Sequence, residues 1–395
     1  MTEIRPDQHG ELKLPDGFLE RRNLTPQSRF WLDERGGDLI LSPVRPDARK
    51  LYLEVTTDCN LNCLTCIRNS WTDPHQHMDE QTFGRVLESI PNLPELERVI
   101  FTSFGEPLVH PKLIGMISAV RELGLDVTLG SNGLLLSEDV CRSLISLGVD
   151  QLVVSIDGGK PETYEGIRGA QLKRIIDNLE NLKRLKQEMQ VIKPTLAVEF
   201  VALASNLHEL TEVLSLASSL HAARLIVSHV LPYTAELNAE KLYGYGPREP
   251  LFTGSWPVQS DVWLRWGVVE TPRMSWGAER RCRFVQDKSL VVNWNGNVSP
   301  CYALSHSYDY YTVDGVLKHV GEHSFGNVNE QPLEEIWMNQ EYNRFRSNVR
   351  AFHFPSCPDC DLRETCDLRQ NNEACWGLNP SCADCLWAQD IVRCP

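Results

Sequence analysis

The sequence of 395 residues lacks any apolar run approaching the ~18 residues that a membrane-spanning helix needs. Its first residues, MTEIRPDQHG, lack the apolar core of a signal peptide. Positive charge is in deficit, with 39 Lys and Arg against 53 Asp and Glu, so a nucleic acid held mainly by its phosphates is excluded. Internal repeats of about 20–50 residues are absent as well. These absences predict a cytoplasmic protein with no membrane partner and no nucleic-acid partner.

Cysteine, by contrast, is abundant, with 13 residues in an otherwise ordinary globular composition. Three cysteines lie near residue 60, nine lie between Cys282 and Cys394, and Cys141 stands alone. Cys141 falls on the apolar face of an expected helix, where a buried structural thiol is expected. Without an export signal, clustered cysteines indicate metal ligands rather than disulfides.

Short apolar runs alternate with helical segments after residue 50. The expected strands are residues 51–56, 98–103, 126–130, 151–156, 196–203 and 224–230. Asp79 is an expected helix N-cap, Pro111 an early helical residue and Asn206 a further candidate cap. Strands that alternate with helices predict an α/β fold with a parallel sheet. Six such units fit a partial (β/α)6 TIM-like barrel, and a flat doubly wound sheet is the alternative that the spacing leaves open.

The composition divides the chain into four expected segments. Residues 1–48 form a polar N-terminal arm with a hairpin around residues 32–41, and residues 49–230 form the barrel. Residues 231–280, rich in Trp, Pro and Gly, form a connecting segment, and residues 281–395 form a cysteine-rich domain of short elements.

The first cysteine group follows the first expected strand with the spacing C-x3-C-x2-C, at Cys59, Cys63 and Cys66. A structural zinc site needs four protein ligands, whereas three thiolates on one loop suit a [4Fe–4S] cluster with one iron open to another ligand. The loop also lies at the end of the barrel where catalytic residues gather. The alternative is half of a zinc site completed by His75 or His77.

This loop resembles the signature of the radical S-adenosylmethionine (SAM) superfamily. The second expected strand leads into Phe104-Gly105-Glu106-Pro107, which is similar to the family's GGEP motif. Two positions depart from the pattern: Phe104 replaces the first glycine, and Thr65 replaces the usual aromatic residue before the third cysteine. The resemblance implies SAM contacts at the ends of successive strands, at Gly105, Glu106, Ser131, Asn132, Ser155, Asp157 and Arg168. Taken singly, the Ser and Asp residues could equally be turn caps.

The nine remaining cysteines resemble the SPASM extension of radical SAM enzymes. They are Cys282, Cys301, Cys357, Cys360, Cys366, Cys375, Cys382, Cys385 and Cys394. The resemblance rests on a C-x2-C-x5-C hook and on Gly296, five residues before Cys301, and it implies two auxiliary [4Fe–4S] clusters. Gln370 stands where the family has a further cysteine, so Cys375 is the expected substitute.

We expect Cys282, Cys301 and Cys375 to ligate the first auxiliary cluster, with Cys394 as its candidate fourth ligand. The second is expected to take Cys357, Cys360, Cys366 and either Cys382 or Cys385. Because Cys394 is the penultimate residue, the tail is expected to be tied to a cluster. The alternative is a zinc ribbon formed by the two C-x2-C hooks of this region.

The resemblance implies an enzyme that reductively cleaves SAM to a 5′-deoxyadenosyl radical and draws electrons from a ferredoxin or flavodoxin. Residues 66–71, 299–304 and 382–387 resemble maturases of tungsten-cofactor oxidoreductases, which implies a protein, peptide or cofactor substrate, with a tungsten oxidoreductase as the candidate. One alternative is a peptide maturase forming thioether or carbon–carbon links, although residues 1–48 are too few for a leader-binding winged helix. The other is a non-enzymatic zinc-bound scaffold. The histidines share no spacing, so no general acid or base is predicted.

Overall fold

The computed structural model describes residues 4–22, 24–35, 37–71, 73–102, 104–245, 267–373 and 375–394. Its centre is a nine-stranded sheet of order β11-β10-β3-β4-β5-β6-β7-β8-β9. The six middle strands are β3 (Lys50–Leu53), β4 (Arg98–Phe101), β5 (Asp126–Ser131), β6 (Gln151–Ser155), β7 (Thr195–Ala202) and β8 (Arg224–His229). They confirm the six expected strands to within a few residues at each end; Ser103, the expected end of the second, lies outside the described residues.

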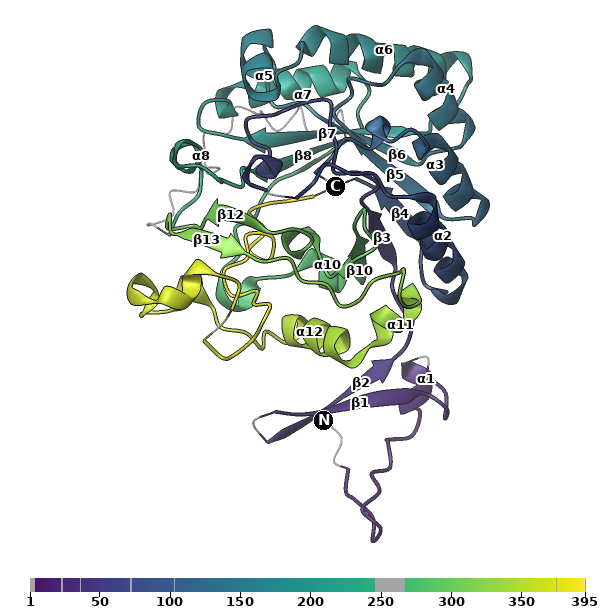
Figure 1. Ribbon diagram of the computed structural model, residues 1–395, viewed down its shortest axis with the longest axis vertical. Coiled ribbons are helices and arrows are strands. Elements are labelled where there is room, and N and C mark those ends of the chain that lie inside the picture. Colours follow the sequence, from purple (N-terminus) through teal and green to yellow (C-terminus); the bar gives the residue numbers. More distant parts are fainter. Residues whose placement is uncertain are drawn as a thin grey trace.

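The strand order distinguishes a barrel from a doubly wound sheet. The six strands are parallel and follow one another in chain order, so right-handed connections place every intervening helix on the same face. Those helices are α2 (Glu80–Ser89), α3 (Leu113–Glu122), α4 (Glu138–Ser146), α5 (Pro161–Arg168), α6 (Leu172–Glu188) and α7 (Leu210–Ser219). Figure 1 shows them along the outer side of the curved sheet. Since β9 and β11 are separate edges, the barrel is partial, as predicted.

Of the three residues expected at helix N-termini, one acts as predicted and two do not. Asp79 caps α2 by accepting a hydrogen bond from the Thr82 amide at 2.7 Å. Pro111 instead precedes α3, which begins at Leu113. Asn206 caps no helix with its side chain, which accepts from the Leu203 amide and donates to two backbone carbonyls. It therefore braces the loop after β7.

Three short strands outside the predicted six widen the sheet. β10 (Ser289–Val292) pairs with β3 in parallel, β11 (Val298–Ser299) pairs with β10 in antiparallel fashion, and β9 (Val268–Glu270) extends the sheet beyond β8. Strands of two to four residues are too short to show an alternating pattern, so the sequence did not predict them. Hydrogen bonds of one sheet thus join the expected barrel to the segments that follow it.

The expected connecting segment is described only in part. Residues 246–266, which include Trp256, Trp263 and Trp266, lie outside the described residues. On either side of them, the chain forms α8 (Ala235–Ala239) and β9.

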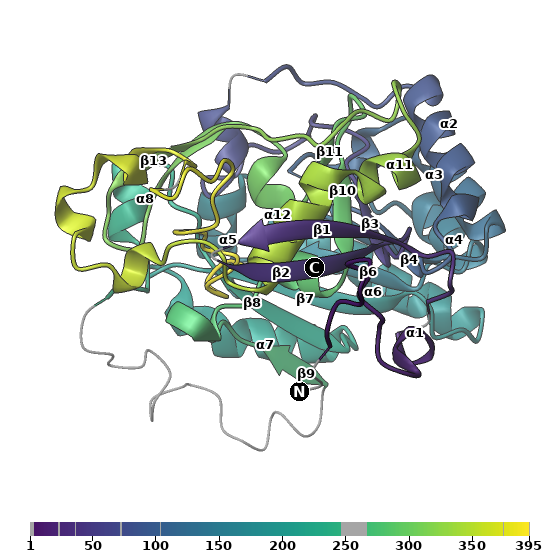
Figure 2. The same ribbon diagram turned by 90° about the horizontal axis from the view of Figure 1, so that it is seen from below.

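The remaining elements belong to the N-terminal arm and the C-terminal extension. They are α1 (Phe18–Arg21), β1 (Arg29–Arg35) and β2 (Asp38–Val44) in the arm, and α10 (Arg283–Gln286), β12 (Tyr308–Tyr311), β13 (Leu317–Val320), α11 (Leu333–Met338) and α12 (Gln340–Arg350) in the extension. The arm forms the predicted hairpin and reaches the extension through Trp31, whose indole N–H donates to the Met338 carbonyl at 3.2 Å. Figure 2 shows the hairpin lying across α12.

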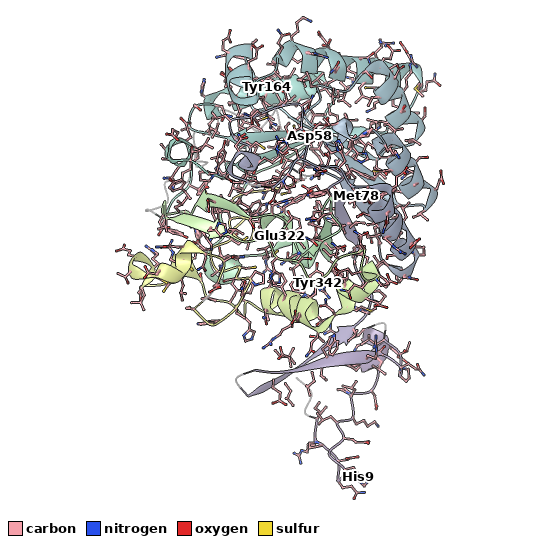
Figure 3. The ribbon with its side chains drawn as sticks, in the orientation of Figure 1. His9, Asp58, Met78, Tyr164, Glu322 and Tyr342 are labelled. Carbon is pink, nitrogen blue, oxygen red and sulfur yellow. The ribbon has the colours of Figure 1, made fainter. Side chains whose placement is uncertain are left out.

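One continuous core runs through the barrel and the extension. It includes Tyr164 of α5 and Tyr342 of α12, both fully buried and marked in Figure 3. Each fully buried large apolar side chain stabilises the fold by about 1.5–3 kcal/mol. Cys141 is also fully buried in this core, as expected, with its thiol 3.8 Å from the Leu136 carbonyl. Among the described residues, no helix has the length and apolar content needed to cross a membrane.

Candidate active site

The loop after β3 brings the three cysteines of the first group to the carboxyl end of the sheet. Its backbone is fixed by hydrogen bonds from the Leu64 amide to the Ile167 carbonyl at 2.8 Å and from the Cys66 amide to the Cys63 carbonyl at 3.1 Å. Burial raises the pKa of the Cys59 and Cys66 thiols, and the nearby Arg68 guanidinium opposes that rise. Thiolates there need positive charge, which iron would supply.

The Gly-Glu-Pro turn is fastened directly to this loop. The Glu106 amide donates to the Asp58 carbonyl at 2.8 Å. A Cβ atom at Gly105 would lie only 2.2 Å from the Thr56 carbonyl oxygen, so no larger residue fits. The glycine therefore permits a close approach of the two backbones, rather than an unusual dihedral angle.

Glu106 is buried beneath the cavity and held by three donors. Its carboxylate accepts from Ser131 Oγ at 2.9 Å, from the Asn132 amide at 2.6 Å and from the Leu108 amide at 3.1 Å. Burial raises its pKa to about 7, and these hydrogen bonds limit the rise. The carboxylate is thus fixed in place for a cationic group in the cavity.

Phe104, which replaces the first glycine of the motif, packs against the C-terminal extension. Its ring lies 5.1 Å from Trp71 and 5.7 Å from Tyr302, in edge-on arrangements. The Tyr302 hydroxyl in turn donates to the Thr102 carbonyl at 2.6 Å. An aromatic residue here joins the second strand end to the extension, a contact that glycine could not make.

The ends of β5 and β6 supply the next polar groups. Asn132 Nδ2 donates to Asn60 Oδ1 at 2.8 Å and lies 3.9 Å from Cys59 Sγ, so it orients the cysteine loop. Ser155 Oγ donates to a Glu199 carboxylate oxygen at 3.4 Å. Burial also raises the pKa of Glu199 to about 7.

Asp157 takes a different position from the one expected. It is fully buried, accepts from Arg168 Nε at 2.5 Å and from the Val201 amide at 2.8 Å, and is not among the residues lining the cavity. Arg168 does face the cavity, with its Nη1 atom 3.9 Å from Cys63 Sγ. Asp157 therefore orients Arg168 rather than facing a ligand, because its carboxylate is fully buried outside the cavity lining while the guanidinium that it binds faces the cavity.

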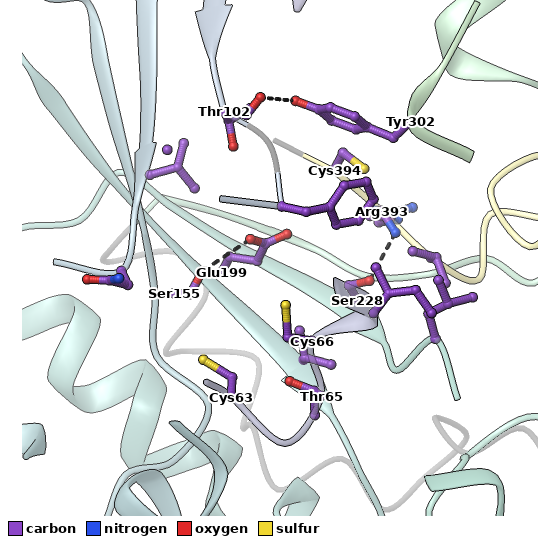
Figure 4. Close-up of a pocket in the computed structure, with 18 of the residues that line it drawn as sticks. Cys63, Thr65, Cys66, Thr102, Ser155, Glu199, Ser228, Tyr302, Arg393 and Cys394 are labelled. Atoms are coloured by element: carbon purple, nitrogen blue, oxygen red, sulfur yellow. Dashed lines mark hydrogen bonds between the residues drawn. The ribbon is translucent and has the colours of Figure 1, made fainter. Parts of the chain in front are cut away.

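One cavity gathers these groups. It has a volume of about 1220 Å³ counted to its open mouth and contains Cys59, Cys63, Cys66 and six of the seven expected SAM contacts, namely Gly105, Glu106, Ser131, Asn132, Ser155 and Arg168. Figure 4 shows the cysteine loop on one side of it and Glu199 on the strand opposite.

The sequence did not predict that the C-terminal tail forms part of the cavity wall. Trp387, Arg393 and Cys394 line it. Figure 4 marks Arg393 and Cys394. The tail is fixed to β8 by a hydrogen bond from the His229 amide to the Ile391 carbonyl at 3.1 Å. Cys394 Sγ accepts from the Trp387 indole N–H at 3.1 Å. No local motif signals this, because it depends on the tail folding back into the barrel.

The auxiliary cysteines assemble differently from the expected grouping. Burial raises the pKa of the Cys301 thiol, and the neighbouring Cys282, Cys385 and Cys382 thiols raise it further. Those four therefore lie together, although the sequence had placed Cys382 or Cys385 with Cys357. The reason is the fold of the tail: the Arg281 amide donates to the Ala388 carbonyl at 3.0 Å, which brings this turn beside Cys282.

The second auxiliary group is centred on the C-x2-C-x5-C hook. Cys357 and Cys366 interact electrostatically, and the Cys360 amide donates to the Cys357 carbonyl at 3.2 Å. Cys375 is exposed, as is Cys360. Within the described ranges, no group of three or more His, Cys, Asp and Glu side chains is arranged to hold a metal ion. A [4Fe–4S] cube is bound at its corners, so its thiolates stand farther apart than the ligands of a single ion.

One histidine has a role that sequence reasoning missed. His306 is buried between two carboxylates, 2.8 Å from Glu54 and 2.8 Å from Asp73. Although burial lowers its pKa, the two carboxylates raise the value to about 9. The ring also stacks on Trp71, with centroids 4.0 Å apart. This charged imidazolium joins the extension to β3, and only the folded chain brings its partners together.

Comparison with known proteins agrees with this arrangement. Residues 53–195 match the radical SAM superfamily, and residues 282–361 match the SPASM iron–sulfur cluster-binding domain. The chain is 34% identical over 348 residues to the tungsten-containing aldehyde ferredoxin oxidoreductase cofactor-modifying protein of Pyrococcus furiosus, a match covering 87% of this chain and 96% of that protein. It is 24% identical over 330 residues to the AdoMet-dependent heme synthase of Methanosarcina barkeri, covering 80% and 90%.

A solved structure shares the fold. The Streptococcus suis protein SuiB, bound to its precursor peptide SuiA, superposes with a TM-score of 0.57 at 15% identity, covering 82% of this chain and 72% of that one.

Proposed function

Because the chain belongs to the radical SAM superfamily and carries a SPASM domain, we propose that its cavity binds SAM at a [4Fe–4S] cluster held by Cys59, Cys63 and Cys66. When bound, this cluster supplies one electron that cleaves SAM and leaves a 5′-deoxyadenosyl radical for hydrogen abstraction. The thiols present fit such a cluster, since three converge on one cavity and leave a position for a non-protein ligand. The observation that carries the proposal is this meeting of three thiols with Glu106 and Arg168.

The protein's residues orient SAM by charge and shape. The Glu106 carboxylate faces the ammonium group of the methionine moiety, and Arg168, held by Asp157, faces its carboxylate. Ser155 at the end of β6 and Glu199, which lies beside it within β7, are placed for the ribose hydroxyls. Thr65 cannot stack on the adenine, so we assign that contact to apolar residues of the cavity wall, Ile67 and Leu231.

We propose two auxiliary clusters with ligand sets revised from the sequence. Cys282, Cys301, Cys382 and Cys385 hold the first, and Cys357, Cys360 and Cys366 hold the second, with Cys375 as its fourth ligand. Cys394 is then the spare thiol, in the wall of the SAM cavity. We also propose that the chain divides into an N-terminal arm that ends at residue 48, a barrel that ends at residue 230, a connecting segment that ends at residue 280, and the cysteine-rich domain.

We propose that the substrate is a tungsten-containing oxidoreductase or its cofactor. The support is the extent of the match to the P. furiosus protein, which spans nearly the whole of both chains. A ferredoxin or flavodoxin is the proposed electron donor, since cleavage needs one low-potential electron for each SAM.

The test uses anaerobically purified, reduced protein with SAM and a tungsten-containing aldehyde oxidoreductase produced without it. We expect a mass change on the oxidoreductase polypeptide or on its extracted cofactor, and none with Cys63→Ser. No mass change on either, while SAM is being cleaved, would contradict the proposed substrate. Modification of a precursor peptide alone would assign the protein to the peptide maturases instead.

A further inference from the structure

A second, smaller cavity adjoins the thiols of the first auxiliary group. It has a volume of about 390 Å³ counted to its open mouth and is lined by Cys301, Cys382 and Cys385 together with Lys318. Lys318 lies on β13, where the charged side chain is buried and its apolar neighbour is exposed, the reverse of the usual arrangement. Leu317 is 50% exposed, whereas Lys318 is 4% exposed. The strand thus turns an ammonium group inward, toward the thiols, and a leucine outward.

Lys318 differs from the other buried cations around it. Arg280 donates to the Ala383 carbonyl at 2.9 Å, Arg369 pairs with Asp314, and Lys241 donates to the Val313 carbonyl at 2.9 Å. Among the described residues, the Lys318 ammonium has neither a hydrogen-bond partner nor a carboxylate within 4.0 Å, although Asp384 acts on it from farther away. A charge that is almost wholly buried and has no partner is unfavourable, so the position of Lys318 at the cavity wall favours an anion in that cavity.

A [4Fe–4S] cluster bound by four thiolates is such an anion. Its core carries two positive charges in the oxidised state, which four thiolates exceed, and reduction adds a further negative charge. A fixed cation in a low-dielectric interior stabilises the more negative, reduced form more strongly than the oxidised one. The same cation also helps to keep the ligating thiolates deprotonated.

We propose that Lys318 is the counter-cation of the auxiliary cluster at Cys282, Cys301, Cys382 and Cys385, and that its charge raises the reduction potential of this cluster. The inference rests on the proposed function, since it requires that cluster to be present. Lys318 is a tuning residue rather than a ligand, because an ammonium group has no lone pair to donate to iron.

The test is a redox titration of the clusters in the full-length, anaerobically reconstituted protein, followed by electron paramagnetic resonance. A Cys301→Ser variant identifies the signal of the cluster in question, and iron analysis establishes loading in every variant. Lys318→Met removes the charge, and Lys318→Arg keeps it. Lys241→Met is the matched control, because it removes a lysine charge from the same hairpin region but outside this cavity.

We expect Lys318→Met to move the midpoint of this cluster to more negative potential, and by more than that of the cluster at Cys357, on which Lys318 also acts; Lys318→Arg and Lys241→Met should stay close to wild type. Selective loss of this cluster in Lys318→Met, with retention in Lys318→Arg, would equally support a charge role. An unchanged midpoint in loaded Lys318→Met, an equal shift in Lys241→Met, or loss of the cluster in both Lys318 variants would overturn the inference. Wild-type protein that takes up no iron would instead contradict the proposed function.

Discussion

The barrel and the C-terminal extension assemble their cysteines in opposite ways. In the barrel, one loop of eight residues carries Cys59, Cys63 and Cys66, and parallel strands position most of the side chains that surround it. In the extension, the four thiols of the first auxiliary group come from segments about 100 residues apart, linked by short elements. We therefore expect the barrel site to form without its cluster, and the extension to depend more on what its thiols bind.

The largest effect is expected from Cys63→Ser, which removes one ligand of the proposed barrel cluster but leaves the fold of the barrel intact. About 4 of ~12 Fe should be lost and SAM cleavage should become undetectable, because the open iron is gone. The thermal unfolding temperature should stay close to that of wild type. Iron analysis, SAM turnover and calorimetry check these three points, with the buried bystander variant Cys141→Ser as the matched cysteine control.

Cys382→Ser should have the converse effect. We expect loss of ~4 Fe together with protease sensitivity confined to the extension, since the cluster would join segments that are far apart in the chain and consist of short elements. Limited proteolysis with mass spectrometry locates the cuts. A variant that loses iron yet resists protease as well as wild type would show that the extension, like the barrel, is folded by its polypeptide alone.

Glu106→Gln should weaken SAM binding by about 10–100-fold, the value of one or two charge-assisted hydrogen bonds at ~1.5–3 kcal/mol. Its amide keeps the shape of the side chain but removes the negative charge that faces the ammonium group. Equilibrium binding of SAM to the reduced, iron-loaded protein measures this effect. Unaltered affinity at full iron content would remove Glu106 from the SAM site.

The last prediction concerns the joint between the two regions, at His306. Its folded-state pKa of about 9 lies above the ordinary 6.5, so its contribution is complete below about pH 6.5 and is lost as the pH rises through about 9. The shift corresponds to roughly 2–4 kcal/mol. The unfolding temperature of wild type should therefore fall more steeply between about pH 7 and pH 10 than that of His306→Gln.

His319→Gln serves as the control for this prediction. His319 forms an exposed pair with Asp309, where solvent screening leaves little stabilisation to lose. Parallel pH profiles for wild type and His306→Gln would show that the buried imidazolium is not what joins the extension to β3.

The same contrast decides how much could be predicted from sequence. The barrel strands are marked by short apolar runs, and the start of α2 is marked by the Asp79 cap, so both are visible in the local sequence. Side chains at successive strand ends must meet at one edge of a parallel sheet. Most of the cavity lining was therefore predictable. Asp157 stands after the expected strand, but its carboxylate binds the Arg168 guanidinium outside the cavity lining, because a charge buried this deeply needs a partner of opposite charge.

The extension gave weaker signals for a physical reason. The grouping of Cys382 with Cys301, the insertion of Cys394 into the barrel and the pairing of His306 with Glu54 all join residues far apart in the chain. The number of candidate thiols could be counted in the sequence. Which of them lie together depends on the return of the tail to β8, which the sequence does not show.

The most direct test of the central claim is the formation of 5′-deoxyadenosine from SAM by the reduced, iron-loaded protein. We predict that wild type forms it, that Cys382→Ser retains SAM cleavage at least in part because its triplet is intact, and that Cys63→Ser forms none. Failure of fully loaded wild type to form 5′-deoxyadenosine, or equal formation by Cys63→Ser, would contradict the assignment of the barrel cysteines as the SAM-cleaving site.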